Sequence, residues 1–359
     1  GDAYQVFFVC QACVGVTFRG PAWVFDGKDV PRSLPSAFID GEGAAWWRSF
    51  VAGQLNRRRP DLLHFVDCLE ILVEGLLLHN SPMFHVFALN TTRLTVRDAA
   101  IVADPTQLPT WPHDEGHAFS PPNTDGIDPG LGSQDVLIER VYISNGDDSI
   151  AVKAGARGGP CTQNVMVQDC VFERGQGASI GSVDAVGPAA GCVRNVTFRR
   201  ILMVRPTFGV RIKTWPAAHG DGTPTSLVAD ITYQDMIIQD AAVSPIKIMQ
   251  YYDHVPWRCI FTSATLLGPP PPPACASTQQ AAEHGVVPVV NVTLERIVAT
   301  GSKMGAGLIC CDQTGGVSAC HVTARDVQIE STWGSFLCTG NCGIAEGVVE
   351  PPSLASCFQ

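Results

Sequence analysis

A short phrase recurs along this chain and restricts its fold more than any other feature. Each copy opens with a polar residue, continues with alternating apolar and polar residues, and ends in a second apolar run. Repetition of this kind indicates a structure built by stacking similar units. The copies are RLTVRDAAIV from Arg93, DVLIERVYIS from Asp135, NVMVQDCVFE from Asn164, NVTFRRILMV from Asn195, DITYQDMIIQ from Asp230, NVTLERIVAT from Asn291 and HVTARDVQIE from His321.

The copies are spaced by about 30 residues. If the second residue of each copy is taken as a marker, successive markers lie 29 to 42 residues apart, except for one interval of 61. We interpret the 61-residue interval as two periods, with SPIKIMQYY from Ser244 forming the missing turn. A period this short, rich in β-branched residues, suits a solenoid of strands rather than strand–helix–strand units. The markers are Leu94, Val136, Val165, Val196, Ile231, Val292 and Val322.

The repeat predicts an all-β fold, a single-domain right-handed parallel β-helix over residues 1–359. Inward side chains of successive coils would stack into apolar ladders, with strands about 4.8 Å apart. A β-sandwich is the alternative, but a sandwich does not require apolar positions that recur at the same place in every repeat. A solenoid needs caps, and we expect the cysteine-rich segment at about 310–359 to be the C-terminal one. The first residues already alternate, as though the N-terminal coils were incomplete.

Composition and cysteine content indicate a secreted protein. Apolar residues make up 45% of the chain, which excludes disorder, and the net charge of −10 argues against a nucleic-acid partner. No stretch is both long enough and sufficiently free of charged residues to span a membrane. Fourteen cysteines and three N-glycosylation sequons, at Asn90, Asn195 and Asn291, indicate disulfides and an extracellular location. A redox or metal site at Cys10 and Cys13 is the alternative to a disulfide there.

Polar residues recur at one phase of the coils in the middle of the chain. They are separated by about one coil each, so we expect them to form a column on one outer face of the solenoid. Glycines beside each motif leave room for a sugar ring to approach the backbone. The column consists of Asp125 in NTDGID, Asp147 in NGDDSIAVKAG, Gln176 in RGQGASIGS, Arg211 in GVRIKTW and Tyr252 in IKIMQYY.

The column contains the groups that glycoside hydrolysis needs. Carboxylates on neighbouring coils repel one another and raise one pKa. One of Asp125, Asp147 and Asp148 would then be a protonated acid while another activates water. Arg211 and Lys213 alternate along one strand and suit a carboxylated sugar. For Asp128 we expect only a turn that satisfies backbone donors.

The motifs NTDGID, GDDSIAVKAG, GQGASIGS and GVRIK resemble, in order and spacing, those of glycoside hydrolase family 28, the polygalacturonase family of pectin-cleaving enzymes. IDGEGAAWW from Ile39 and HNSPMFHV from His79 look like its N-terminal signatures, and the C-terminal cysteines resemble its small disulfide loops. The resemblance implies a right-handed parallel β-helix that hydrolyses α-linked galacturonic acid with inversion. It implies no metal and no cofactor, and we expect a monomer.

The same resemblance assigns roles to individual residues. Asp147 would be the general acid, and Asp125 and Asp148 would hold and activate the water. The other residues would bind substrate: Arg211 and Lys213 through its carboxylate, with Gln176, Asn123 and Tyr252 as further contacts, although Tyr251 is adjacent to the last of these.

Two positions depart from the family pattern. Ser149 stands where the family usually has cysteine, and Gln176 stands where polygalacturonases usually have histidine. A histidine can carry charge and tune the acid, whereas a glutamine forms hydrogen bonds but does not titrate. The alternatives are therefore a rhamnogalacturonan or exo-acting pectin-oligomer hydrolase, and a non-catalytic β-helix that binds polysaccharide. For an enzyme we expect an acidic pH optimum.

Three further segments have simpler interpretations. We interpret TWPHDEGH at 110–117 as a wall of the cleft, with a metal site as the alternative. The proline-rich run at 268–277 is interpreted as a stiff surface loop. NRRRP at 56–60 is the only basic cluster, and we interpret it as a solvated turn.

Overall fold

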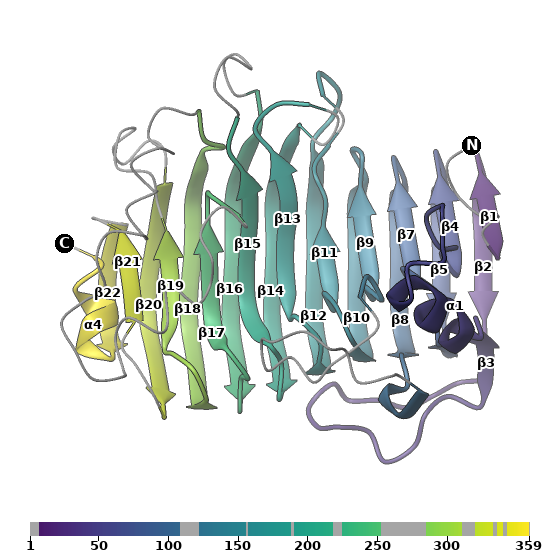
Figure 1. Ribbon diagram of the computed structural model, residues 1–359, viewed down its shortest axis with the longest axis horizontal. Helices are drawn as coiled ribbons and strands as arrows, with labels where there is room; N and C mark the ends of the chain where they lie inside the picture. The colour runs from purple at the N-terminus through teal and green to yellow at the C-terminus, as the bar shows by residue number, and fades with distance from the viewer. Residues whose placement is uncertain are drawn as a thin grey trace.

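The computed structural model confirms the predicted right-handed parallel β-helix. Every paired strand runs parallel to its neighbour, and each coil adds one strand to each of two sheets that extend along the whole molecule (Figure 1). The structure describes residues 7–107, 122–155, 157–187, 190–217, 225–252, 285–310, 320–332, 336–339 and 343–358.

The first sheet, called here the short-strand sheet, has ten strands. They are, in order, β1 (Phe8–Gln11), β4 (Leu63–Val66), β7 (Val86–Leu89), β9 (Ile127–Gly130), β11 (Ile150–Val152), β13 (Ala178–Asp184), β15 (Phe208–Trp215), β17 (Ser244–Met249), β19 (Gly307–Cys310) and β21 (Phe336–Thr339).

The second sheet, called the long-strand sheet, also receives one strand from each coil. A small addition at its N-terminal end consists of β3 (Ala37–Asp40) and β6 (Leu76–His79), and β6 pairs with β8. The main strands are β2 (Val14–Arg19), β5 (Leu69–Glu74), β8 (Thr92–Val102), β10 (Gln134–Asn145), β12 (Thr162–Arg174), β14 (Cys192–Val204), β16 (Leu227–Gln239), β18 (Val289–Ser302), β20 (Cys320–Ser331) and β22 (Gly343–Glu350).

The marker residues of the repeat form one ladder through the core. Val136, Val165, Val196, Ile231, Val292 and Val322 pair in succession, and all are buried. Because Ile231 pairs directly with Val292, the 61-residue interval is one coil and not two. The interpretation of two periods is therefore wrong. The segment from Ser244 forms β17, which belongs to the same coil as β16, and the additional length lies between β17 and β18.

The polar residue that opens most copies of the repeat makes a tight corner. Asn164, Asn195, Asp230 and Asn291 all have positive φ, between 52° and 58°. Asparagine and aspartate adopt this left-handed conformation more readily than most residues. Their side chains also bond from coil to coil, since Nδ2 of Asn195 donates to Oδ1 of Asn164 at 2.8 Å. The corner geometry thus explains why five of the seven copies open with Asn or Asp.

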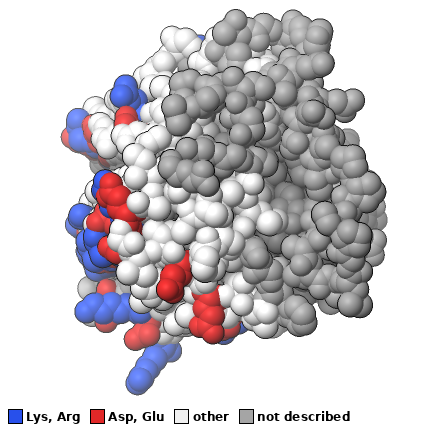
Figure 2. All heavy atoms as spheres, turned by 90° about the vertical axis from the view of Figure 1, so that its left-hand side faces the viewer, with Lys and Arg blue, Asp and Glu red and all other residues white. Residues whose placement is uncertain are grey.

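A second set of left-handed residues bends the long strands, and it alternates in charge. In the bends of β8 and β10, Arg140 donates to both carboxylate oxygens of Asp98, at 2.7 and 3.0 Å. Seen end-on, the described charged side chains gather toward one side of the molecule (Figure 2). We call this set the charge ladder: Asp98, Arg140, Asp169, Arg200, Asp235, Arg296 and Asp326, with φ between 48° and 53°.

Disulfides occur near both ends and in the middle. Cys10 bonds to Cys13, which supports the disulfide interpretation of that motif, and Cys161 bonds to Cys192. At the C-terminal end, a Cys338–Cys357 disulfide ties the chain just beyond helix α4 (Pro352–Ala355) to β21. The described residues also form helix α1 (Gly43–Val51) and the 3₁₀ turn Pro105–Gln107. No helix in the described part of the chain is long and apolar enough to cross a bilayer.

Candidate active site

Three of the predicted site residues occupy equivalent positions on successive coils. Asp125, Asp148 and Gln176 each lie two residues before a strand of the short-strand sheet, namely β9, β11 and β13. The first residues of these strands pair with one another, so the three side chains start from neighbouring points on the same edge. The parallel register therefore places two carboxylates and an amide side by side.

Asp148 is the most deeply buried of the predicted carboxylates, with 1% of its surface exposed. Its Oδ1 accepts hydrogen bonds from Ser179 Oγ at 2.7 Å and from Arg211 Nη1 at 3.2 Å, and its Oδ2 accepts one from Lys213. Burial alone would raise its pKa, but the charges of Lys213 and Arg211 outweigh burial and lower the pKa to about 2. Asp148 is therefore ionised at any ordinary pH.

Asp147 has the opposite electrostatic environment. Its Oδ2 accepts a hydrogen bond from the backbone N–H of Asn123 at 2.7 Å, and its Oδ1 accepts one from the N–H of Asp148 at 2.9 Å. Burial, followed by the charges of Asp125 and Asp148, raises its pKa to about 7. Asp147 is also more accessible than Asp125 or Asp148. It is therefore a carboxyl group that can hold a proton and deliver it to a ligand.

Asp125 and Asp128 share one lysine. Lys153 Nζ lies 3.3 Å from Oδ2 of each. Burial raises the pKa of Asp125 well above its ordinary value, with a further increase from Asp128, and burial raises that of Asp128 to about 6. The interpretation of Asp128 as a turn residue is wrong, because it lies inside β9 and pairs with Lys153. Sequence reasoning missed Lys153, although a lysine that directly follows the buried strand IAV was a usable signal.

Arg211 connects the carboxylates to the remaining predicted residues. It donates to Gln176 Oε1 through Nη1 and to Tyr252 Oη through Nη2, the latter at 3.1 Å. Tyr251 instead packs in a buried apolar cluster, so of the two tyrosines only Tyr252 joins the site. Arg211 and Lys213 are only 4% and 7% exposed, so they are buried at the site and are not a solvated surface pair.

A buried arginine supports the segment that carries Asn123. Arg59 donates to the carbonyl oxygens of Pro82 and Pro122, at 2.9 and 2.6 Å, and to Asn123 Oδ1 at 3.1 Å. The segment 56–60 is therefore not simply a solvated turn, because one of its arginines is 2% exposed. Burial lowers the pKa of Arg59 to about 10, so it remains charged at neutral pH.

The charges of the site nearly balance. Three cations, Lys153, Arg211 and Lys213, contact the carboxylates of Asp125, Asp128 and Asp148, whereas Asp147 accepts hydrogen bonds from backbone N–H groups. Arg59, whose charge also acts on Asp147 and Asp125, brings the cations to four. Burial and the repulsion from Asp125 and Asp148, rather than an excess of negative charge, therefore favour a proton on Asp147. Oxygens of Asp125, Asp147 and Asp148 lie within 4.8 Å of one another, a spacing that a metal ion could bridge. The adjacent cations Lys153, Arg211 and Lys213 would repel such an ion.

The sequons lie away from this edge. Asn195 and Asn291 are exposed on β14 and β18 of the long-strand sheet, and Asn90 lies just before β8. Each has positive φ, and Asn90 Nδ2 donates to Asp67 Oδ1 at 2.7 Å. The segments 110–117 and 268–277 lie outside the described residues, so the structure does not test their interpretations.

Comparison with known proteins identifies relatives over most of the chain. Polygalacturonase QRT2 of Arabidopsis thaliana is 32% identical over 234 residues, which cover 64% of this chain and 46% of that protein. Probable endopolygalacturonase E of Aspergillus niger is 30% identical over 255 residues, covering 70% and 60%. The chain thus spans about half the length of these curated relatives.

A solved structure gives the same fold. The endo-xylogalacturonan hydrolase of Aspergillus tubingensis superimposes with a TM-score of 0.65 at 21% identity, covering 88% of this chain and 75% of that one. At this identity the likeness concerns the β-helix alone. The family model of glycosyl hydrolases family 28 matches residues 18–263, and this range contains the carboxylate cluster and its cations. The chain therefore belongs to glycosyl hydrolases family 28.

Proposed function

We propose that this protein is a secreted polygalacturonase-like glycoside hydrolase that cleaves α-linked galacturonic acid in pectin with inversion. The observation that carries the proposal is the difference in pKa between two adjacent carboxyl groups. The pKa of Asp147 is about 7 and that of Asp148 is about 2. Two carboxyl groups whose pKa values differ in this way can act as the acid and the base in glycoside hydrolysis. Family membership and relatives named as polygalacturonases support the substrate class.

Asp147 acts as the general acid. Its proton is available below about pH 7, and its accessible carboxyl group can reach a glycosidic oxygen. Proton donation to the leaving oxygen lets the carbon–oxygen bond break without forming an alkoxide. The N–H groups of Asn123 and Asp148 stabilise the carboxylate that remains after transfer.

Asp148 and Asp125 hold the attacking water. Asp148 accepts three hydrogen bonds, which leaves one of its roughly four lone-pair sites for a water. Asp125 Oδ1 is buried and has no hydrogen-bond partner among the described residues. Two oxygens within 4.8 Å of each other can both reach one water at hydrogen-bond distance, about 2.8 Å. Asp148 would take the proton that the water loses, since it is the ionised member.

The C-terminal side of the cluster binds the substrate carboxylate. Arg211 and Lys213 supply the charge there, and Tyr252 and Gln176 hold the guanidinium in place. Gln176 takes part through its amide oxygen and adds no charge, so it supports positioning in place of the titration that a histidine would offer.

The described disulfides support an oxidising and therefore extracellular location. We propose a monomer with glycans at Asn90, Asn195 and Asn291, and with neither nucleic-acid nor membrane partners. Mass spectrometry of the protein from a eukaryotic host, with and without glycosidase treatment, tests the sequons.

The decisive experiment compares the wild type with Asp147→Asn on polygalacturonate and on rhamnogalacturonan, with release of reducing ends as the readout. We expect the wild type to cleave polygalacturonate and the variant to be inactive. If only rhamnogalacturonan is cleaved, the substrate is rhamnogalacturonan and not polygalacturonate. Failure on both polymers from acidic to neutral pH would favour the non-catalytic polysaccharide-binding β-helix.

The configuration of the product is a separate test. The clustered oxygens lie closer than the carboxyl groups of most inverting glycosidases, which are about 6.5–9.5 Å apart. Proton NMR of the first product formed should nevertheless show the β-anomer. Initial release of the α-anomer would mean that one carboxylate attacks the sugar directly.

A further inference from the structure

An apolar cavity adjoins the carboxylate cluster on its N-terminal side. It has a volume of about 420 Å³ and opens on the outer face of the short-strand sheet, where β7, β9 and β11 end. Apolar side chains form most of its wall, and Leu131 is 41% exposed at the rim. The lining consists of Phe87, Leu89, Leu131, Lys153, Ser182 and the backbone at 154–155.

The cavity contains one cation, and that cation already has partners. Of the described residues that line it, Lys153 alone is basic, and its Nζ pairs with Asp125 and Asp128 at 3.3 Å. Gly130 leaves space for this arrangement, since a Cβ there would lie 2.9 Å from Lys153 Cβ. On the far side of Phe87, Arg58 and His64 both contact the carboxylate of Asp61.

The opposite side of the cluster is cationic. Arg211 and Lys213 on β15 and Lys247 on β17 point outward there, and Lys247 Nζ lies 4.6 Å from the centre of the Phe208 ring. The cleft therefore changes along the solenoid axis, from an apolar wall at β7 to β11 to a cationic wall at β15 and β17. A polymer in contact with both would meet an apolar wall on the coils that carry the carboxylates and a cationic wall on the coils that follow.

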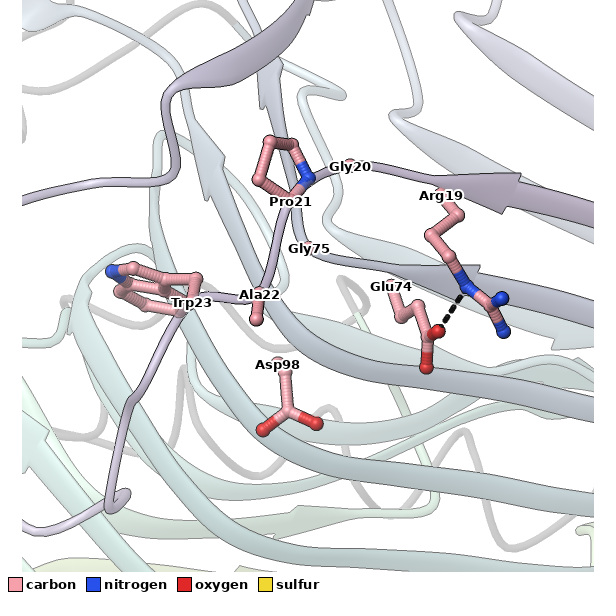
Figure 3. A pocket seen from close by; sticks show the side chains of 8 residues that line it. All are labelled: Arg19, Gly20, Pro21, Ala22, Trp23, Glu74, Gly75 and Asp98. Atoms are coloured by element: carbon pink, nitrogen blue, oxygen red, sulfur yellow. Dashed lines mark hydrogen bonds and ion pairs between the residues drawn. The ribbon is translucent and has the colours of Figure 1, made fainter.

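A second cavity, on the long-strand sheet, shows what a charge-lined site looks like in this molecule. It measures about 330 Å³ and lies among Trp23, Glu74 and Asp98 (Figure 3). Its acidic groups are paired with arginines, as Glu74 is with Arg19. The cavity beside the cluster differs because its exposed wall is apolar.

We propose that the apolar cavity is a substrate subsite for a galacturonosyl residue whose carboxyl group is methyl-esterified. This inference rests on the proposed function. A free carboxylate placed there would lose water without gaining an unpaired cation, because Lys153 already pairs with Asp125 and Asp128. A methyl ester carries no charge, and its methyl group buries apolar surface against Phe87, Leu89 and Leu131. The volume is within the range of sites that hold a single small ligand.

The kinetic test measures kcat/KM on partly methyl-esterified and on unesterified polygalacturonate, and takes their ratio. Leu131→Arg adds a free cation at the rim, and Leu131→Gln removes apolar surface without adding charge. A methyl group in an apolar pocket changes discrimination by about tenfold. We therefore expect Leu131→Arg to lower the ratio of esterified to unesterified cleavage by about tenfold, and Leu131→Gln to lower it less.

The matched control is Ile237→Arg, which places the same charge on an exposed residue of β16 in the other sheet. The control should keep the wild-type ratio, and circular dichroism should show all variants folded. If the ratio stays unchanged in Leu131→Arg, or falls equally in the control, the inference is wrong while the proposed function stands.

A binding test separates the two proposals if no polymer is cleaved. Calorimetric titration of Asp147→Asn needs no turnover, and it compares trigalacturonate, the same trimer methyl-esterified on one terminal residue only, and a rhamnose-containing trisaccharide. Preference for the methyl ester, lost on adding Leu131→Arg, supports the subsite whatever the activity. Preference for the free acid or for the rhamnose-containing sugar overturns it.

Discussion

The carboxylate cluster and the charge ladder are both stacks of charged residues on neighbouring coils, yet they differ in sign order. In the ladder each arginine lies between aspartates, and hydrogen bonds from Arg200 and Arg296 lower the pKa of Asp169 and Asp235. In the cluster the aspartates are adjacent and buried, and the pKa of Asp147 is raised. The strand spacing of about 4.8 Å is the same in both columns, yet the pKa values of their aspartates shift in opposite directions.

The difference shows that the order of charges, rather than the fold, decides what a column of residues does. Alternating signs at a partly exposed corner give pairs that each stabilise the protein by about 0–1 kcal/mol. Like signs at a buried edge leave one carboxyl group protonated and reactive. If this comparison is right, equivalent substitutions in the two columns should have very different consequences.

The largest expected difference concerns activity. Asp147→Asn removes the proposed acid and should lower kcat by roughly 10²–10⁴-fold. Asp169→Asn makes the same change in the ladder and should leave kcat within about twofold. Steady-state assays on polygalacturonate give both numbers. Comparable losses in the two variants would show that Asp147 contributes through folding rather than through catalysis.

The next difference concerns stability. Lys213→Met leaves buried Asp148 without one of its two cations and should lower the free energy of unfolding by about 3–5 kcal/mol. Arg200→Met removes a partner of Asp169 at a site where both side chains are partly exposed, and should cost about 0–1 kcal/mol. Urea unfolding followed by circular dichroism compares them. Equal costs would contradict the contrast between buried and exposed columns.

The third prediction concerns pH. The acid must be protonated, so kcat/KM should fall about tenfold per unit above pH 7, where Asp147 loses its proton. On the acid side, activity should persist until Asp148 gains a proton near pH 2, unless the protein unfolds first. An optimum at alkaline pH would refute this assignment.

Gln176→His sharpens the pH prediction. An imidazolium beside Arg211 would favour the ionised form of Asp147, so the alkaline limb should move to lower pH. Gln176→Glu reverses the added charge and should move the limb to higher pH. Identical profiles in the two variants would show that position 176 does not act on the acid electrostatically.

The smallest effect is expected within the ladder. Asp235→Lys puts three positive charges in sequence, with Arg200 and Arg296 as its neighbours, and should destabilise the protein by about 1 kcal/mol. The loss should shrink in 1 M salt, where exposed charges are screened. Asp235→Asn is the control, because it removes the charge and weakens the hydrogen bonds without adding a positive charge. If the loss of stability in Asp235→Lys does not depend on salt, packing rather than charge repulsion is its cause.

The fold was predictable because the apolar positions of the repeat are the positions that are buried in the core. Marker residues such as Val165 and Val196 are inward on every coil, so their phase survives variation in the loops. The 61-residue interval misled the prediction, since spacing alone does not separate an extra coil from a long insertion. Only the direct pairing of Ile231 with Val292 distinguishes them.

The candidate site was predictable where it depends on the coil period and not where it depends on packing. The period predicted that Asp125 and Gln176 occupy equivalent positions, but it placed Asp147 and Arg211 in the same column, whereas the register puts Asp148 level with Asp125 and Gln176 and puts Arg211 level with Ser179. Lys153 and Arg59 act through long side chains that reach across coils, and no period marks such contacts. Likewise, spacing could not decide between Tyr251 and Tyr252, because neighbouring residues face opposite ways and only the packing shows which one reaches Arg211.

The direct pairing of β16 with β18 across a 61-residue interval has a consequence for how such proteins diversify. Closing a flexible loop costs entropy that grows only logarithmically with length, about 0.6 kcal/mol for each doubling. A coil of twice the ordinary length therefore gives up less stability than most single substitutions in the core. Chain length can therefore be added between two strands of a coil while β16 and β18 still pair directly.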